Sequence, residues 1–370
     1  MGLTRSTSLA LVGAAVLLVG SVPAFAQSPS APSMDALVAA AKAEGTLTTI
    51  ALPHDWCGYG AVIDGFKAKY GLAVNELAPD AGSGDEIQAI IANKDNPGPQ
   101  APDVVDVGLS FGPDAVAQGL LAPYKVATWG DIPDSVKDAD GYWYGDYYGV
   151  LALETNKSIV ATPPTSFADL TKADYANQVA LAGDPNVSNQ AISAVYAAAL
   201  ASGGSLDDAS KGLDFWKSVV TAGNFVPTIA NPGTIDQGAT PITLRWSYNA
   251  LAHRDAAAAQ GIEIDVTLPS DTPPFAGVYI QAISAFAPHP NAAKLWMEYL
   301  YSDEGQNLWL NGYCYPARFE AMKAAGTIPA ETLAKLPDAT GAVFPTLDQL
   351  AAAKKVITEG WNTAVGVTVQ

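Results

Sequence analysis

One pattern in this 370-residue chain has the spacing of a catalytic motif, GLSFG at residues 108–112. It matches the G-x-S-x-G elbow of serine hydrolases, in which a strand–turn–helix exposes the central serine, here Ser110. His253 and His289 follow it in the chain order of that class. However, no HGGG-type segment precedes the motif, and Pro113 moves the expected helix start away from Ser110. We expect Ser110 to offer hydrogen bonds to a ligand, and a periplasmic serine hydrolase remains the alternative.

Four loops rich in small and polar residues have the composition of ligand-binding loops: PHDWCGYG, PDAGSGDE, VGLSFG and GDPNVSNQ. Each leads into an expected helix, whose free N–H groups and partial positive charge favour a carboxylate, phosphate or phosphonate. Their candidate ligand-binding residues are His54, Asp55, Trp56, Gly82, Ser83, Ser110, Phe111, Asp184, Ser188 and Asn189. An equally good interpretation makes Ser83 and Ser188 helix caps only, with Ser83 and Glu86 spaced as a capping box.

Aromatic and charged residues near the ends of expected strands complete the candidate site. Trp56, Tyr148, Trp246, Tyr248 and Tyr279 could stack on a planar ligand or hold an amine by cation–π contact. Arg245 ends the expected strand ITLR and could clamp an anion, or it could pair within its own domain. An ammonium group could instead be received by a set of acids, namely Asp55, Asp106, Glu154 and Asp184.

The adjacent Tyr147 and Tyr148 raise the possibility of a ferric-iron site. Neighbouring side chains of a strand point to opposite faces, so both phenolates could not bind one metal ion. His54 and acidic residues could still complete an oxygen-rich site, and iron therefore stays open as a third ligand class. We predict no metal cofactor for the protein itself.

The two cysteines, Cys57 and Cys314, leave three arrangements open. Export to an oxidising compartment favours a disulfide between the early and late chain. Two separate buried thiols come next. A zinc site that uses His54 and Cys57 has little support, because no second closely spaced ligand pair exists.

The elements that must position these residues alternate between strand and helix. Three strand–loop–helix units precede residue 124, and a second α/β set begins near residue 179. Two extended crossings, near residues 148–156 and 276–287, should join two domains around a ligand-binding cleft. The fold class is thus α/β, with one lobe formed by residues 35–150 plus 281–370 and the other by residues 151–280.

The N-terminal residues indicate an exported protein. Residues 1–26 have a basic start, a short apolar run and an AFA cleavage site, so we expect a signal peptide cleaved after Ala26 and a mobile tail over residues 27–34. Residue 27 is Gln, which does not indicate a lipid anchor. The formal net charge of −18 disfavours nucleic acid and anionic lipid as partners. We expect a soluble periplasmic monomer.

Several segments resemble the type II periplasmic substrate-binding proteins of ABC importers: LVAAAKAEGTLTTIA, GLLAPY, DGYWYGDYYGVLALETN and PHPNAAKLWMEYLYSDEGQ. In particular the chain is similar to the extracellular solute-binding group that includes ferric-iron, thiamine, polyamine and aminoethylphosphonate binders. This resemblance implies a two-lobed Venus-flytrap fold, no catalysis, no cofactor, and delivery of a bound solute to an inner-membrane permease. It does not fix the solute, because one scaffold serves many ligands.

Among solutes, the loops favour a small organic anion or zwitterion. A polyamine or thiamine-type cation, held by acidic and aromatic residues, is the second expectation, and ferric iron is the third. The sequence leaves open the identity of the solute, the permease and the resting open or closed state.

Overall fold

The computed structural model describes residues 1–4, 33–336 and 338–370. The chain divides into two units, residues 1–33 and residues 34–370. The predicted signal peptide and tail lie, apart from residues 1–4, 33 and 34, outside the described residues. No helix of the described part is both long and apolar enough to cross a membrane.

The first part of the unit formed by residues 34–370 contains the three predicted strand–helix repeats. The elements are α1 (Met34–Glu44), β1 (Thr46–Ile50), α2 (Tyr59–Tyr70), β2 (Ala73–Leu77), α3 (Ser83–Asn93), β3 (Val104–Gly108), η1 (Leu109–Phe111), α4 (Gly112–Ala117) and β4 (Leu121–Ala122). Gly71 ends α2 in the left-handed conformation that glycine adopts without strain, and its N–H closes the last turn on Lys67.

The middle of the chain contains the long strand β5 and a second α/β set. Its elements are η2 (Trp129–Asp131), η3 (Asp134–Val136), β5 (Trp143–Asn156), η4 (Ala168–Thr171), η5 (Ala173–Tyr175), β6 (Val179–Leu181), α5 (Asn189–Ala201), α6 (Ser210–Thr221), α7 (Pro232–Asp236), β7 (Ile242–Trp246), α8 (Ser247–Ala258), β8 (Ile264–Thr267) and β9 (Ala276–Ser284). The last part is mainly helical: α9 (Pro290–Leu300), α10 (Asp303–Asn311), β10 (Tyr315–Pro316), α11 (Phe319–Ala325), α12 (Ala330–Leu333) and α13 (Leu347–Ala364).

Two sheets organise these elements. In one, β1 and β2 pair in parallel. In the other, the strands follow the order β3-β9-β5-β7-β6; in addition, β4 pairs with β9, and β8 and β10 pair with β5. The backbone N–H of Asp103 donates to Thr48 and its carboxylate accepts the Thr48 N–H at 2.6 Å, which holds the start of β3 beside β1. This mixed α/β architecture confirms the predicted fold class.

The long strand β5 belongs to both halves of the larger sheet. Its first part, Trp143 to Val150, pairs with β9, whereas its second part, Leu151 to Asn156, pairs with β7 and β8. A bulge between Gly145 and Tyr147 shifts the register within the first part. The two crossings expected near residues 148–156 and 276–287 thus correspond to adjacent antiparallel strands.

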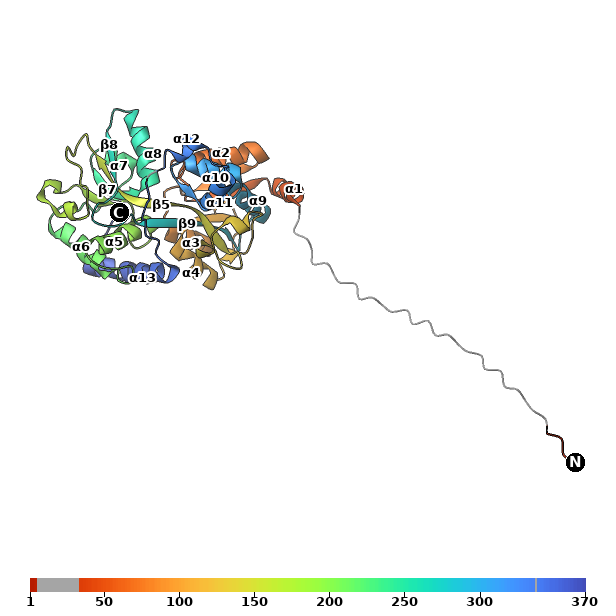
Figure 1. The fold of residues 1–370 in the computed structure, drawn as a ribbon. Helices are drawn as coiled ribbons and strands as arrows, with labels where there is room; N and C mark the ends of the chain where they lie inside the picture. Colours follow the sequence, from red (N-terminus) through yellow and green to blue (C-terminus); the bar gives the residue numbers. More distant parts are fainter. Residues whose placement is uncertain (5–32, 337) are drawn as a thin grey trace. The chain divides into compact units, whose positions relative to one another are not determined.

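The C-terminal helix α13 lies against elements of both α/β sets. It packs on α5 and α6 (Figure 1), and the terminal Gln370 exchanges backbone hydrogen bonds with Pro227 and Ile229. The ring of Trp361 contacts Phe225. The same helix also packs on η1, and its Lys354 pairs with Asp114 of α4, so α13 contacts both α/β sets. The division that groups residues 281–370 with the first lobe stays a prediction.

Cys57 and Cys314 form a disulfide that joins the loop after β1 to the segment after α10. Their Cα atoms lie 5.6 Å apart, both side chains are fully buried, and 257 positions separate them in the sequence. Because Trp56 immediately precedes Cys57, the bond also anchors the loop after β1. Cys57 is thereby unavailable to the zinc site that the H-x-x-C spacing allowed.

We expect the double substitution Cys57→Ala/Cys314→Ala to lower the free energy of unfolding by about 4 kcal/mol, because cross-linking so long a loop strongly restricts the unfolded chain. Urea unfolding of the variant, beside oxidised and reduced wild type, measures the effect. Equal stability of oxidised and reduced wild type would contradict this expectation.

Candidate functional site

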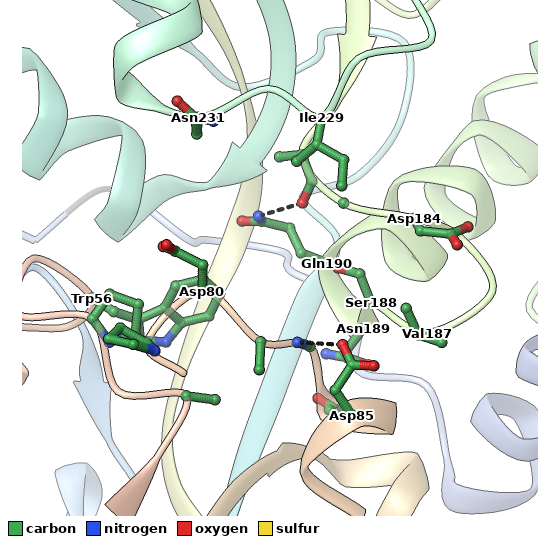
Figure 2. A pocket seen from close by; sticks show the side chains of 18 of the residues that line it. Trp56, Asp80, Asp85, Asp184, Val187, Ser188, Asn189, Gln190, Ile229 and Asn231 are labelled. Carbon is green, nitrogen blue, oxygen red and sulfur yellow. Dashed lines mark hydrogen bonds between the residues drawn. The ribbon is translucent and has the colours of Figure 1, made fainter. Parts of the chain in front are cut away.

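A cavity of about 650 Å³ opens where the loops after the parallel strands meet. Its β1–β3 side is lined by residues from the segments 51–56 and 79–86 and by Asp106; its β6–β7 side is lined by residues from the segments 182–190 and 229–232 and by Arg245. Figure 2 shows Trp56 and Asp80 on one side of the cavity, opposite Asp184 and Val187. The β9 residue Tyr279 also contributes to the lining. The cavity corresponds to the cleft that the two crossings predicted.

Nine of the fifteen predicted ligand-binding residues line this cavity. Every predicted loop except VGLSFG contributes to them, and two come from strands: Asp55, Trp56, Gly82, Ser83, Asp184, Ser188 and Asn189 from the loops, and Arg245 and Tyr279 from β7 and β9. Whether they bind a ligand remains a prediction.

The other six lie outside the lining of the cavity. His54 is largely exposed and bonds to Glu76 at 2.6 Å, while Ser110 is buried in η1. Phe111 packs beneath the ammonium of Lys354, which lies 3.9 Å from its ring centre.

The remaining three are aromatic residues with structural surroundings. Trp246 and Tyr248 are fully buried, and Trp246 packs so tightly on Gly277 that a Cβ there would lie 2.0 Å from the indole. Tyr148 stacks on Tyr315 and lines a second, largely apolar cavity of about 600 Å³ near the start of α13. Trp246→Ala would therefore disturb packing, and it is a poor test of ligand binding.

The hydrolase arrangement around Ser110 is not assembled. His253 bonds to Glu154 and Asp236, and His289 bonds to Asp103 at 2.9 Å. Both candidate bases are thus held by carboxylates in other parts of the fold.

The iron interpretation finds little support in the same geometry. Both tyrosines contribute to the lining of the second cavity, but their side chains have different partners: the Tyr147 hydroxyl bonds to Asp106, whereas Tyr148 stacks on Tyr315. Within the described part of the chain, no group of three or more His, Cys, Asp or Glu side chains could hold a metal ion.

Several carboxylates of the cavity were missed as site residues: Asp80, Asp85 and Glu86. The loop PDAGSGDE contains all three, but the spacing of Ser83 and Glu86 was read as a capping box. The predicted capping pair is wrong, because other residues make the capping hydrogen bond. Gly82 is the N-cap and its N–H is held by Asp85 at 3.1 Å, while Ser83 Oγ accepts the Gly108 N–H.

The Glu86 side chain does not cap α3 and instead points toward β3. Its Oε2 accepts the backbone N–H of Asp106 at 2.9 Å, and its side chain is 1 % exposed. Burial raises its pKa well above the usual value, and the nearby Asp106 carboxyl raises it further.

Asp106 is the centre of a buried hydrogen-bond network at the base of the cavity. Its Oδ2 accepts the Tyr147 hydroxyl at 2.6 Å, and that hydroxyl in turn accepts the Trp56 indole N–H at 2.6 Å. Tyr59 donates to Asp146 and receives a hydrogen bond from Gln281. Burial raises the pKa of Asp106 to about 7, although the hydroxyl of Tyr147 opposes the shift.

Arg245 is the one basic residue that lines the described cavity, and it already has a buried counter-ion. Its guanidinium donates to Glu154 at 3.0 Å, and His253 bonds to the other oxygen of the same carboxylate. Burial opposes the charge of Glu154, but Arg245 and His253 together lower its pKa. The guanidinium charge is therefore largely compensated before any solute enters.

Two helix N-termini at the cavity differ in charge. α3 begins with Asp85 and Glu86 in its first turn, so its partial positive charge is already offset. α5 has no acidic residue in its first turn, and Ser188 caps it through the Ala191 N–H. Of the two, α5 is the better location for an anionic group.

The two sides of the cavity touch each other directly. The Gly84 N–H at the start of α3 donates to the Val187 carbonyl at 3.2 Å. Gly108 has no side chain at the point where Asn189 approaches, and a Cβ there would lie 2.1 Å from the Asn189 side chain. The structure therefore has the two sides in contact around the cavity, and the glycine permits that approach.

Two sets of α/β elements, joined by the adjacent strands β5 and β9, thus surround a cavity with a size and a lining suited to a small solute. Residues 100–341 match the family model of bacterial extracellular solute-binding proteins, and the chain belongs to that family. It is a solute-binding protein of the ABC-importer class that acts outside the cytoplasm, as the resemblance predicted. A search of curated proteins gives no match.

Solved structures share the fold at low sequence identity. The periplasmic binding protein AfuA of Actinobacillus pleuropneumoniae, with fructose-6-phosphate bound, is 18 % identical over 86 % of this chain and 98 % of its own, with a TM-score of 0.65. A periplasmic thiamin binding protein is 20 % identical over 86 % of this chain and 96 % of its own, also at 0.65. Iron-bound HitA of Pseudomonas aeruginosa is 19 % identical over 87 % and 99 %, at 0.61.

The raised pKa of Asp106 predicts a specific pH dependence of stability. The folded protein retains the proton up to about pH 7, whereas the unfolded chain loses it near pH ~4, so this group's contribution falls as pH rises between the two. Wild type should therefore lose stability relative to Asp106→Asn when the pH is raised from ~5 to ~8. The difference between their free energies of unfolding should change by a few kcal/mol at most.

Urea unfolding of wild type and Asp106→Asn at both pH values measures this difference. Asp80→Asn is the control, because it removes an exposed carboxylate from the same cavity and leaves Asp106 in place. A stability difference between wild type and Asp106→Asn that does not change with pH would contradict the prediction.

Proposed function

We propose that the cleft binds a small solute that carries at least one protonated amine, and that the protein delivers it to an inner-membrane ABC permease. The observation behind this proposal is the acidity of the lining: Asp55, Asp80, Asp85 and Asp184, together with the buried carboxyls of Glu86 and Asp106, against Arg245 alone. Because Glu154 already compensates that arginine, the cavity favours positive charge.

The aromatic residues of the lining support the same class of solute. Trp56 and Tyr279 meet edge to face with ring centres 5.4 Å apart. The partly exposed indole of Trp56 offers a surface for an alkylammonium or a planar cation beside the carboxylates. This arrangement favours the polyamine or thiamine-type cation over the purely anionic solute that the loops favoured.

A zwitterion is the second candidate, and the first turn of α5 is the observation that favours it. That turn bears no acidic residue, and Asn189 and Gln190 lie in the lining with Arg245 nearby in the same wall. An amine would lie against the β1–β3 side and a phosphonate or carboxylate against α5. A solute without an amine would leave the acidic side uncompensated.

The domain arrangement proposed for this function keeps the two predicted lobes but moves the last helix. Residues 35–150 and the chain from residue 281 to about residue 345 form the first lobe, and residues 151–280 with α13 form the second. Closure of the lobes would exclude water from the solute and present a closed face to the permease. We further propose a monomer without catalytic activity, released by cleavage after Ala26.

A thermal-shift panel tests the solute class. Spermidine, putrescine, thiamine and 2-aminoethylphosphonate represent amines; citrate and glycerol 3-phosphate represent anions; Fe(III) represents the metal alternative. We expect at least one amine to raise the melting temperature, because a ligand that binds only the folded state stabilises it. Stabilisation confined to the anions or to Fe(III) would overturn the proposal.

Trp56→Ala should weaken binding of the amine about tenfold or more, through loss of the cation–π surface and of the hydrogen bond to Tyr147. Trp129→Ala is the matched control, because it removes an indole that is also partly buried but lies outside the cavity lining. Calorimetric titration measures both affinities, and equal affinities would show that the aromatic part of the site is misplaced.

A further inference from the structure

Two carboxyls lie together in the interior with no cation to balance them. Asp106 on β3 is 3 % exposed and Asp146 on β5 is fully buried, and Tyr147 links them, because its backbone N–H donates to Asp146 and its hydroxyl donates to Asp106. Among the ion pairs of the described residues, none involves Asp106, Asp146 or the adjacent Glu86. Two adjacent buried carboxylates cannot both ionise without compensation, so such a pair retains a proton.

The hydrogen bonds of this pair leave one oxygen atom unmatched. Asp146 accepts its own neighbour's N–H, that of Tyr147, at 2.7 Å and the hydroxyl of Tyr59 at 3.4 Å. Asp106 Oδ2 accepts the Tyr147 hydroxyl, but Oδ1 is buried and finds no donor within the described residues. A proton held between the two carboxyls would supply the partner that Oδ1 lacks.

The pair is connected to the ligand cavity through Asp106. Asp106 and Glu86 both line the cavity, whereas Asp146 lies outside the lining. The Trp56 indole, which also lines the cavity, bonds to the same Tyr147 hydroxyl that donates to Asp106. A cation at the wall formed by Trp56 would therefore approach the one carboxyl of the pair that faces the solute.

We propose that Asp106 is the counter-ion of the solute's amine and that the bound ammonium replaces the proton that Asp106 shares with Asp146. This inference rests on the proposed function. One ammonium enters the site and one proton leaves to water, so the net charge of the buried site stays constant. No bond other than the O–H bond of the carboxyl breaks. Asp106 then also determines specificity, because a solute without a cationic group cannot displace the proton.

The groups that face the pair come from each neighbouring element and are acidic or neutral. They are Tyr59 on α2, Asp85 and Glu86 on α3, Tyr147 on β5, Tyr248 on α8, Tyr279 and Gln281 on β9, and Tyr301 after α9. Burial raises the pKa of both Asp106 and Asp146, and their mutual repulsion adds to the shift of Asp146. Affinity for the amine should therefore rise with pH and level off above neutrality, by about tenfold per pH unit at most.

Calorimetric titration with spermidine and with 2-aminoethylphosphonate tests the exchange in two buffers of different ionisation enthalpy, on both sides of neutrality. For whichever amine binds, wild type should release up to about one proton on the acidic side. Asp106→Asn should release none and bind about tenfold or more weakly. Asp146→Asn, which keeps the counter-ion, should bind with an affinity that depends less on pH.

Infrared spectroscopy of the ligand-free protein gives a readout that needs no ligand. A carbonyl band of protonated carboxylic acids should be present at neutral pH, lose the intensity of one carboxyl on binding of the amine, and be weaker in Asp106→Asn, where the buried Glu86 still contributes. Asp80→Asn is the matched control, and it should keep both the band and the proton release while losing one exposed charge of the cavity.

The outcomes separate this inference from the proposed function. Binding of an amine without proton release, or with an unchanged band, would overturn the proton exchange and leave the amine site intact. Failure of all four amines of the thermal-shift panel to bind at either pH would overturn the proposed function and the exchange together. Proton release that persists in Asp106→Asn would assign the proton to another group.

Discussion

The antiparallel pairing of β5 with β9 is the interaction on which the rest of the structure depends. These strands run next to each other where the two α/β sets meet, and β5 continues into its pairing with β7. The first part of β5 positions Asp146 and Tyr147, and its second part positions Glu154. One continuous strand thus positions both Asp146, the buried neighbour of Asp106, and Glu154, the counter-ion of Arg245. The backbone of β5 therefore fixes the positions of acidic side chains on both sides of the cavity.

Burial of charge explains why the two sides of the cavity differ. On the β6–β7 side, Glu154 is surrounded by Arg245 and His253, and these partners overcome the cost of burial and keep the carboxylate ionised. On the β1–β3 side, Glu86 and Asp106 are buried without a basic partner, and their pKa values rise. The first arrangement is complete without a solute, whereas the carboxyls of the second are those to which we assign the proposed cation.

The sequence predicted the architecture better than the site because the two depend on different information. Hydrophobic alternation and glycine stops are local, and they located β1, β3, β5 and β9. The partners of a side chain are not local: Glu86 has the spacing of a cap, but Asp106, twenty residues later, provides its hydrogen bond. Likewise, Trp246 follows Arg245 at the end of a strand, a position that predicts a site residue. The close packing of its indole on Gly277 of another strand shows that it belongs to the core.

The expectation of a small organic anion or zwitterion depends on treating every helix N-terminus at the cleft as positive. A helix dipole contributes about half a charge, so one carboxylate in the first turn is sufficient to cancel it. α3 has two such acids, and the Gly84 N–H at its start is already bonded to Val187. A helix N-terminus therefore indicates an anion site only where its first turn lacks acids and its N–H groups remain open to the cavity. In this cleft α5 meets the first condition, while the carboxylates beside α3 make the opposite wall a site for positive charge.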